Sequence, residues 1–315
     1  MRVVIPLDVG LSLLGDLPGE VAVSVWDPVG SAGAPPGGGA GVDLWVPPFP
    51  PLASYAERLA QLPDLRVLQL LTAGYDHVLT SVPDGLTVCN AGHIHDDPVA
   101  EWAVAGLLAM VRALPIHIRA QAAGESLQFE SDTLIGATVL LLGYGGIGQA
   151  IARRLAGFQV EVVPVASRAR PHDGVHGPGE LPDLLPAADA VVIAAPVTAA
   201  TRGMVDAAFL ARLPDGAVIV NAARGAIVDQ PALAAELTTG RLRAVLDVTT
   251  PDPLPAGDPL RALPNVLYTP HVAGATRLIF PRIFGLVVDQ IRRRLAGEPL
   301  VNVVAGPALP PPPAS

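Results

Sequence analysis

The chain has 315 residues, of which 20 are basic and 29 acidic, so its formal net charge is −9. All the basic residues are arginine, and the absence of lysine excludes Schiff-base catalysis and a Walker A phosphate site. The acidic balance provides no basic surface, so we expect neither nucleic acid nor a membrane as a partner. The single cysteine, Cys89, and an N-terminal sequence without a leader pattern predict a cytoplasmic protein.

Short β-branched runs alternate with helical patterns in the first third of the chain, the order expected of a parallel sheet with crossover helices. The strands expected there are Val3–Pro6, Val21–Val25, Val42–Trp45, Val67–Leu71 and Thr87–Cys89. A long helix should follow, opened by Asp96, Asp97 and Pro98 and continuing to Leu114. Because this helix is apolar almost all round, we expect it to be buried.

A second alternating series follows this helix. Its expected strands are Thr138–Leu142, Val160–Val165, Ala190–Ala194, Ala217–Asn221, Ala244–Asp247 and Val266–Tyr268, and its expected helices include Ile147–Ala156, Pro231–Thr238 and Ile279–Leu295. The length of the chain suggests about two domains. The two series together predict an α/β protein.

A glycine-rich segment joins one predicted strand to the next helix, and it reads Gly143-Tyr144-Gly145-Gly146-Ile147-Gly148. This is G-x-G-x-x-G in the strand-to-helix context of a dinucleotide site. Gly143 permits the tight turn, Gly145 lets the backbone approach a pyrophosphate, and Gly148 lets the helix pack closely on the strand. The alternative in so glycine-rich a chain is a structural turn, but both flanks favour dinucleotide binding.

The residues after the second strand of this series indicate which dinucleotide is bound. An NAD site normally has an acidic residue there, which accepts a hydrogen bond from the ribose 2′-hydroxyl. This chain instead has Ser167, Arg168 and Arg170. Guanidinium groups suit a 2′-phosphate, so NADP(H) is the preferred cofactor and NAD(H) the second choice. The alternative is that both arginines are solvated loop residues.

From the glycine loop onward the sequence resembles the D-isomer-specific 2-hydroxyacid dehydrogenases, which include glyoxylate/hydroxypyruvate reductases and phosphoglycerate dehydrogenase. The matching segments are GYGGIG, AAPVTAATRGMVD, VIVNAARGAIVDQPALAAEL, VLDVTTPDPLP and YTPHVAGAT, in the family's order and spacing. The resemblance implies two doubly wound parallel-sheet domains with a cleft between them. The Rossmann-type cofactor domain would be 97–274, and the flavodoxin-like substrate domain 1–96 with 275–306. The tail 307–315 is expected to be disordered, and a homodimer is implied.

The resemblance assigns three polar residues to catalysis. Arg224 matches the arginine that binds the carboxylate and reacting carbonyl of a 2-oxo acid, for which a planar guanidinium is suited. His271 matches the proton donor to the alkoxide that hydride transfer leaves. Asp252 stands where the family usually has a glutamate that hydrogen-bonds this histidine. Aspartate is one methylene shorter, so it must approach more closely or act through water, and the alternative is that it misses the imidazole.

Further contacts are carried over from the same motifs. Asp247 matches the acid that accepts from the nicotinamide carboxamide, with a strand-end cap as the alternative. Pro196, in the segment AAPVTAATRGMVD, is expected to contact the cofactor. Ala73 and Gly74 match the loop whose backbone N–H groups receive the substrate carboxylate. Tyr75 either shapes the pocket or packs within the turn.

These residues predict an NADPH-preferring reductase that acts on a small 2-oxo acid of the glyoxylate or hydroxypyruvate type. The rival hypothesis is a dinucleotide-responsive binding protein, similar to the corepressors on this scaffold, with weak or no turnover. Arg224 and His271 oppose the rival, and the altered Asp252 leaves it open. The run His93–Asp97 has no convincing ligand spacing, so no metal site is expected.

Overall fold

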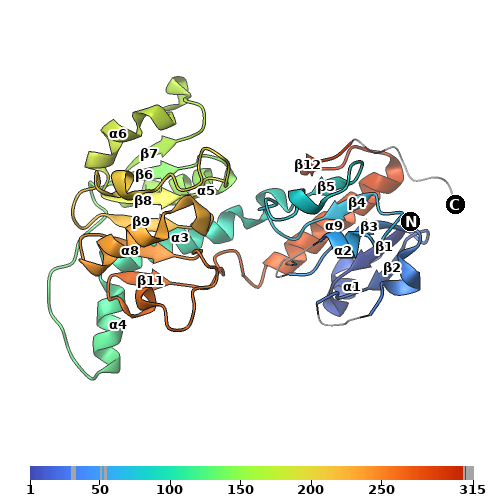
Figure 1. The fold of residues 1–315 in the computed structure, drawn as a ribbon, viewed down its shortest axis with the longest axis horizontal. Helices are drawn as coiled ribbons and strands as arrows, with labels where there is room; N and C mark the ends of the chain where they lie inside the picture. Colours follow the sequence, from blue (N-terminus) through green and yellow to red (C-terminus); the bar gives the residue numbers. More distant parts are fainter. Residues whose placement is uncertain (30–32, 50–51, 53–54, 308, 310–315) are drawn as a thin grey trace. The chain divides into compact units, whose positions relative to one another are not determined.

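A computed structural model describes residues 1–29, 33–49, 52, 55–307 and 309. Its internal contacts divide the chain into two compact units, each containing one sheet (Figure 1). Unit 1 comprises Met1–His95 and Arg277–Ser315, and unit 2 comprises Asp96–Thr276. The tail expected to be disordered lies outside the described residues, apart from Pro307 and Leu309.

Unit 1 has a six-stranded sheet in the order β12-β5-β4-β3-β1-β2. Its elements are β1 (Arg2–Ile5), α1 (Asp8–Leu14), β2 (Ala22–Val25), β3 (Val42–Trp45), α2 (Ala56–Leu59), β4 (Val67–Gln69), β5 (Thr87–Cys89), α9 (Ile279–Ala296) and β12 (Val303–Ala305). Strands β1 to β5 are parallel in the flavodoxin-like order, whereas β12 is antiparallel to β5.

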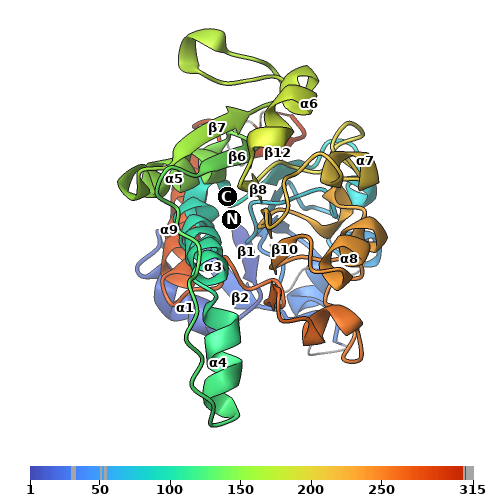
Figure 2. The same ribbon diagram turned by 90° about the vertical axis from the view of Figure 1, so that its left-hand side faces the viewer.

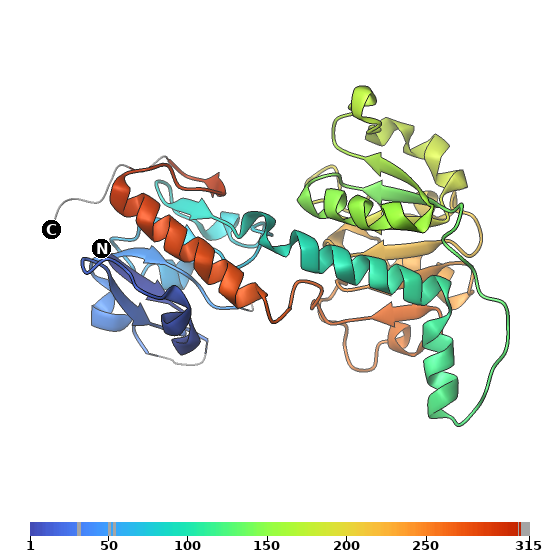
Figure 3. The same ribbon diagram turned by 180° about the vertical axis from the view of Figure 1, so that it is seen from behind.

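Successive side chains of these strands enter two separate cores, as the period of a strand requires. Val3 and Ile5 of β1 belong to a cluster with α9, which lies along the sheet in Figure 3. Val4, between them, belongs to the opposite cluster with Trp45 and Tyr55. Both faces of the sheet are therefore covered, which is the rule for parallel sheets.

Helix α9 also carries buried polar groups that fix it to the sheet. Arg294 is 5% exposed, and its Nη2 lies 3.0 Å from Oδ1 of Asp43 on β3. Gln290 donates from Nε2 to Oε1 of Gln69 on β4, at 2.9 Å, and to the carbonyl of Val301, at 2.8 Å. These contacts join the C-terminal segment of unit 1 to its N-terminal strands.

Unit 2 has an all-parallel sheet in the order β11-β10-β9-β8-β6-β7. Its strands are β6 (Thr138–Leu142), β7 (Glu161–Val165), β8 (Ala190–Ile193), β9 (Val218–Asn221), β10 (Arg243–Leu246) and β11 (Val266–Tyr268). Its α-helices are α3 (Asp96–Val111), α4 (Leu114–Ala122), α5 (Gly146–Leu155), α6 (Leu181–Leu184), α7 (Ala207–Leu210) and α8 (Gln230–Thr238). Every predicted strand is present, with bounds shifted by two residues or fewer, and the α/β class is confirmed.

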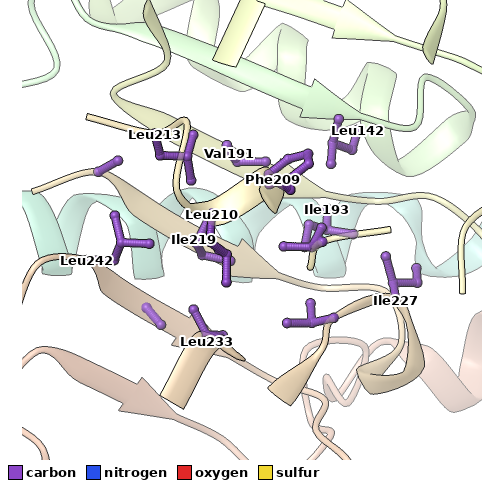
Figure 4. Close-up of a cluster of buried hydrophobic side chains, with 14 of the residues drawn as sticks. Leu142, Val191, Ile193, Phe209, Leu210, Leu213, Ile219, Ile227, Leu233 and Leu242 are labelled. Carbon is purple, nitrogen blue, oxygen red and sulfur yellow. The ribbon is translucent and has the colours of Figure 1, made fainter. Parts of the chain in front are cut away.

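The helices of unit 2 cover both faces of this sheet, seen edge-on in Figure 2. Helices α3 and α5 pack with Leu141 and Val245 on one face. Leu140 and Leu246 pack with α7 and α8 on the other face, whose side chains are drawn in Figure 4. Because both faces are buried, the strands consist almost entirely of apolar residues, and only their ends carry polar side chains.

Helix α3 is shorter than the predicted helix, which continued to Leu114. It ends at Val111, and Ala113 adopts a left-handed conformation with φ 53° before α4 begins. Pro115 explains the break, because proline has no N–H to donate and its ring excludes a continuous helix.

Within the described residues, no single helix is long and apolar enough to cross a membrane. Only the pair of segments Gly92–Val111 and Leu114–Ala122 together meets these criteria of length and composition, and the two segments are bent by 70° relative to each other.

The sheet of unit 2 ends at β7, where a further Rossmann strand would pair. Only one parallel bridge, between Val165 and His176, lies on that side within the described chain. The chain returns from β7 through residues 166–177 and makes this contact on its way to α6. The segment that follows β7 is therefore short, and it is fixed at both ends.

Substitution of Asp43 tests the contribution of the buried ion pair. Asp43→Ala removes the carboxylate beside Arg294 and should lower the free energy of unfolding of unit 1 by about 3 kcal/mol. The matched control is Asp289→Ala, which breaks the exposed Arg293–Asp289 pair and should cost less than about 1 kcal/mol. Urea unfolding of both variants measures the difference. Equal losses would contradict a special contribution from the buried pair.

Candidate active site

The glycine loop lies at the carboxyl end of β6, where the strand order reverses between β6 and β8. Such switch points bind ligands in open α/β sheets. Gly143 has φ 100°, and a Cβ there would lie 2.6 Å from the backbone carbon of Ala194. A Cβ on Gly148 would collide with the carbonyl oxygen of Gly143. Both positions therefore require glycine for packing alone.

Gly145 requires a different explanation, because a Cβ there would meet nothing within 4 Å. Open space beside this backbone, next to the first turn of α5, is where a ligand can contact the main chain. The first N–H groups of a helix have no partner inside the helix and favour an anion. These residues fit the pyrophosphate of a dinucleotide, and a side chain at Gly145 would obstruct it.

Residues 166–177 form a folded loop after β7. The amide of Ala166 donates to the carbonyl of His176 at 3.0 Å, and the amide of Arg170 donates to Val175 at 2.7 Å. Glu180 holds the far end, since its Oε1 accepts from Gly177 N and its Oε2 lies 2.7 Å from His176 Nδ1. The Gly177 hydrogen bond, followed by that of His176, lowers the pKa of Glu180.

A cavity of about 750 Å³ lies between this loop and α5. Its walls are Tyr144, Gln149, Ala152, Arg153, Arg170 and Asp173. Of the residues predicted to bind the cofactor, Tyr144 and Arg170 line it, whereas Ser167 and Arg168 are exposed nearby on the same loop. Sequence reasoning did not find Arg153. The signal was available, because Gln149 and Arg153 are four residues apart and share one face of α5.

Pro196 lies in the loop after β8, the strand next to β6 in the sheet. Its carbonyl accepts from Thr201 Oγ1 at 2.6 Å, and Thr201 Oγ1 also accepts from the amide of Thr198 at 2.8 Å. These bonds hold the loop 196–201 in a compact turn. The structure thus places Pro196 and the glycine loop at the ends of adjacent strands.

Asp247 follows β10 and is 2% exposed. Its Oδ1 accepts from Thr269 Oγ1 at 2.6 Å and from Val272 N at 2.8 Å, and its Oδ2 accepts from Ala273 N at 2.9 Å. All three donors belong to the loop after β11. The carboxylate therefore caps this loop, the arrangement that sequence analysis held as the alternative to a carboxamide contact.

His271 lies in that loop with φ 56°, a left-handed conformation that is strained for a residue with a side chain. Its amide donates to the carbonyl of Asp247 at 2.7 Å. Its Nδ1 lies 2.8 Å from Oδ2 of Asp252, and the two side chains are 51% and 27% exposed. The shorter carboxylate thus reaches the imidazole directly. With Nδ1 engaged, Nε2 is the nitrogen available to a ligand.

Arg224 lies just after β9, in a turn that Asn221 organises. Asn221 is 1% exposed; its Oδ1 accepts from Ala223 N at 3.1 Å, and its Nδ2 donates to the carbonyl of Arg224 at 3.0 Å. A Cβ on Gly225 would collide with the carbonyl oxygen of Thr249, so the turn passes close to the end of β10. Sequence reasoning did not single out Asn221, although a polar residue ending an apolar strand marked its position.

The predicted substrate loop lies after β4 in unit 1. The carbonyl of Ala73 accepts from Asn90 Nδ2 at 2.6 Å, and that of Gly74 accepts from Thr72 Oγ1 at 2.6 Å. Within the described residues, the amides of Ala73 and Gly74 donate to no protein group. Tyr75 is exposed. The loop therefore has fixed carbonyls and two N–H groups that can bind a carboxylate.

Among the described residues, no group of three or more His, Cys, Asp or Glu side chains could hold a metal ion. Burial lowers the pKa of His95 to about 4, so this side chain is neutral near pH 7.

Comparison with known proteins decides the family. The model of the D-isomer specific 2-hydroxyacid dehydrogenase NAD-binding domain matches residues 104–273. The chain belongs to this family. Its members include oxidoreductases that use a nicotinamide dinucleotide, so the chain is placed among the NAD(P)-dependent 2-hydroxyacid dehydrogenases.

Individual relatives align with different fractions of this chain. Human glyoxylate reductase/hydroxypyruvate reductase is 33% identical over 249 residues, 75% of this chain and 76% of the human protein. D-3-phosphoglycerate dehydrogenase of Mycobacterium tuberculosis is 37% identical over 268 residues, 80% of this chain, which spans about half (49%) of that relative. The crystal structure of an NADPH-dependent glyoxylate/hydroxypyruvate reductase from Sinorhizobium meliloti, in complex with NADP and sulfate, matches with a TM-score of 0.82. The two sequences are 28% identical, and the match covers 96% of this chain and 98% of the Sinorhizobium meliloti chain.

Asp247→Asn tests whether this carboxylate positions the His271 loop. The amide would retain one acceptor oxygen and present an N–H group to a backbone donor, so the free energy of unfolding should fall by about 2 kcal/mol. Misplacement of His271 should lower kcat about tenfold or more, with little change in the KM for the dinucleotide. Steady-state kinetics separate the two parameters. A raised dinucleotide KM with unchanged kcat would favour the carboxamide contact instead.

Asp252→Asn tests the pairing with His271. Because the imidazolium loses its carboxylate partner, kcat should fall at least about tenfold, and the pH optimum of reduction should move to lower pH. Asp252→Glu should retain most of the activity. The control is Asp258→Asn, which lies in the same segment and keeps an oxygen to accept from Leu260 N. An Asn variant with the original pH profile would argue against the pairing.

Proposed function

We propose that this chain reduces a small 2-oxo acid of the glyoxylate or hydroxypyruvate type to the 2-hydroxy acid with NADPH. The observation that carries the proposal is the His271–Asp252 pair, whose histidine lies in the loop that Asp247 caps at the carboxyl end of β10. A paired imidazole in a fixed loop is suited to proton transfer. The glycine loop at the end of β6, in the same sheet, is suited to the dinucleotide.

The side chains divide the chemistry between them. Arg224 binds the substrate carboxylate and polarises the carbonyl oxygen. Bound NADPH supplies the hydride to the carbonyl carbon. His271 then gives its Nε2 proton to the alkoxide, and Asp252 stabilises the imidazolium before that transfer.

Preference for NADPH rests on the loop after β7. No acidic residue stands at the end of β7, where an NAD site would use one, whereas Ser167, Arg168 and Arg170 follow it. A 2′-phosphate carries nearly two negative charges at neutral pH, which two guanidinium groups can neutralise. The Sinorhizobium meliloti reductase, described as NADPH-dependent, supports the same preference.

The proposal includes a homodimer formed through unit 2. Helix α4 and the segment after it expose large apolar side chains, and the rings of His117 and Phe129 stack there with centroids 4.8 Å apart. The exposed residues are Leu114, Ile116, Ile118, Leu127, Phe129 and Ile135. A second copy would remove this apolar surface from water.

The test measures NADPH oxidation by the purified chain with glyoxylate, hydroxypyruvate and bulkier 2-oxo acids. Turnover is expected with the small acids, with kcat/KM for NADPH exceeding that for NADH by about tenfold or more. His271→Ala and Arg224→Ala should each lower kcat/KM by at least about a hundredfold. Arg212→Ala, an exposed arginine of unit 2 that lines none of these features, is the matched control.

Two outcomes would overturn parts of this proposal. Tight dinucleotide binding without turnover of any acid would favour the rival, a dinucleotide-responsive binding protein. Faster turnover with NADH than with NADPH would reject the cofactor preference and leave the reductase activity standing.

A further inference from the structure

The cavity between α5 and the loop after β7 combines features that the glycine motif does not explain. Its walls bring together two arginines from different elements, Arg153 of α5 and Arg170 of the loop. The same walls contain one carboxylate, that of Asp173. A cavity of about 750 Å³ is large enough for a phosphate group and part of the ribose that carries it.

Arg153 contributes an unused cation to this cavity. It is exposed on α5, and within the described chain its side chain makes no hydrogen bond or ion pair. Its neighbour Arg154 is different, because it is paired with Asp97 of α3 at 3.0 Å. The two consecutive arginines therefore have separate roles: Arg154 fixes α5 to α3, and Arg153 remains available to a ligand.

Asp173 gives Arg170 an internal partner. Oδ2 of Asp173 lies 3.6 Å from Nε of Arg170, and the side chains are 66% and 43% exposed respectively. At this distance the contact is an ion pair and not a hydrogen bond. Such an exposed pair is weak, so a ligand with two negative charges can displace the carboxylate.

On the basis of the proposed function, we propose that Arg153 and Arg170 together hold the 2′-phosphate of NADPH, and that Asp173 competes with this phosphate for Arg170. Asp173 thereby lowers the affinity for NADPH in two ways: it occupies Arg170, and its negative charge repels the 2′-phosphate. These three side chains adjust the preference for NADPH over NADH that the loop after β7 provides. Arg153 strengthens the preference, and Asp173 limits it.

The experiment measures calorimetric binding of 2′,5′-ADP and of 5′-AMP, two probes that differ only in the 2′-phosphate. Asp173→Asn should tighten 2′,5′-ADP about threefold, within the range of an exposed ion pair. Arg153→Ala should weaken it about tenfold, the size of a charge-assisted hydrogen bond. Binding of 5′-AMP should change less than about twofold in both variants. High salt should reduce both effects, because they act between exposed charges.

Matched controls use exposed residues of the same unit that do not line the cavity. Asp183→Asn and Arg212→Ala make the same charge changes and should leave both affinities unchanged. Thermal unfolding of each variant reports whether it folds like the original chain.

The outcomes separate this inference from the cofactor preference on which it rests. If the original chain binds 2′,5′-ADP no more tightly than 5′-AMP, the preference for NADPH is itself rejected. If the original chain prefers 2′,5′-ADP but Arg153→Ala and Asp173→Asn behave like their controls, only the present inference fails. Opposite shifts of the two variants, confined to 2′,5′-ADP, support it.

Discussion

The carboxylate of Asp247 is the constraint on which the candidate chemistry depends. It is almost completely buried and accepts three hydrogen bonds from the loop after β11. These three hydrogen bonds offset the conformational energy of the left-handed backbone at His271. Asp247 directly follows β10, a strand whose residues are buried in the hydrophobic core. Through Asp247, the sheet therefore fixes the position of the His271 imidazole. Asp252, which contacts the imidazole, then needs only to fix the orientation of the ring.

Polar side chains also fix the turns of two other proposed ligand groups. Asn221 organises the turn of Arg224, and Asn90 with Thr72 fixes the carbonyls of the substrate loop. In each case a short polar side chain satisfies the backbone of an irregular turn. Loops can carry function at strand ends because the sheet supplies a fixed base for them.

Sequence patterns predicted the strands because both faces of each sheet are buried and the strands are apolar throughout. They singled out Gly143, Arg224 and His271 as candidate site residues because these positions belong to dense local motifs. They did not find Arg153, which became a cavity residue only when the loop carrying Arg170 folded back toward α5. Nor did they predict β12, whose three residues form a strand by pairing with β5, distant in sequence. Pairing across such distances leaves no periodic signal.

The single bridge between Val165 and His176 has a consequence for the evolution of this fold. A full strand at that edge would tie every residue after β7 into the register of the sheet, and changes there would disturb its hydrogen bonding. A one-residue bridge leaves the stretch between its two anchors outside the ladder. Substitution of its exposed charged side chains should therefore cost little folding stability. The proposed nucleotide preference can therefore change while the hydrophobic core and the loops after β10 and β11 stay as they are.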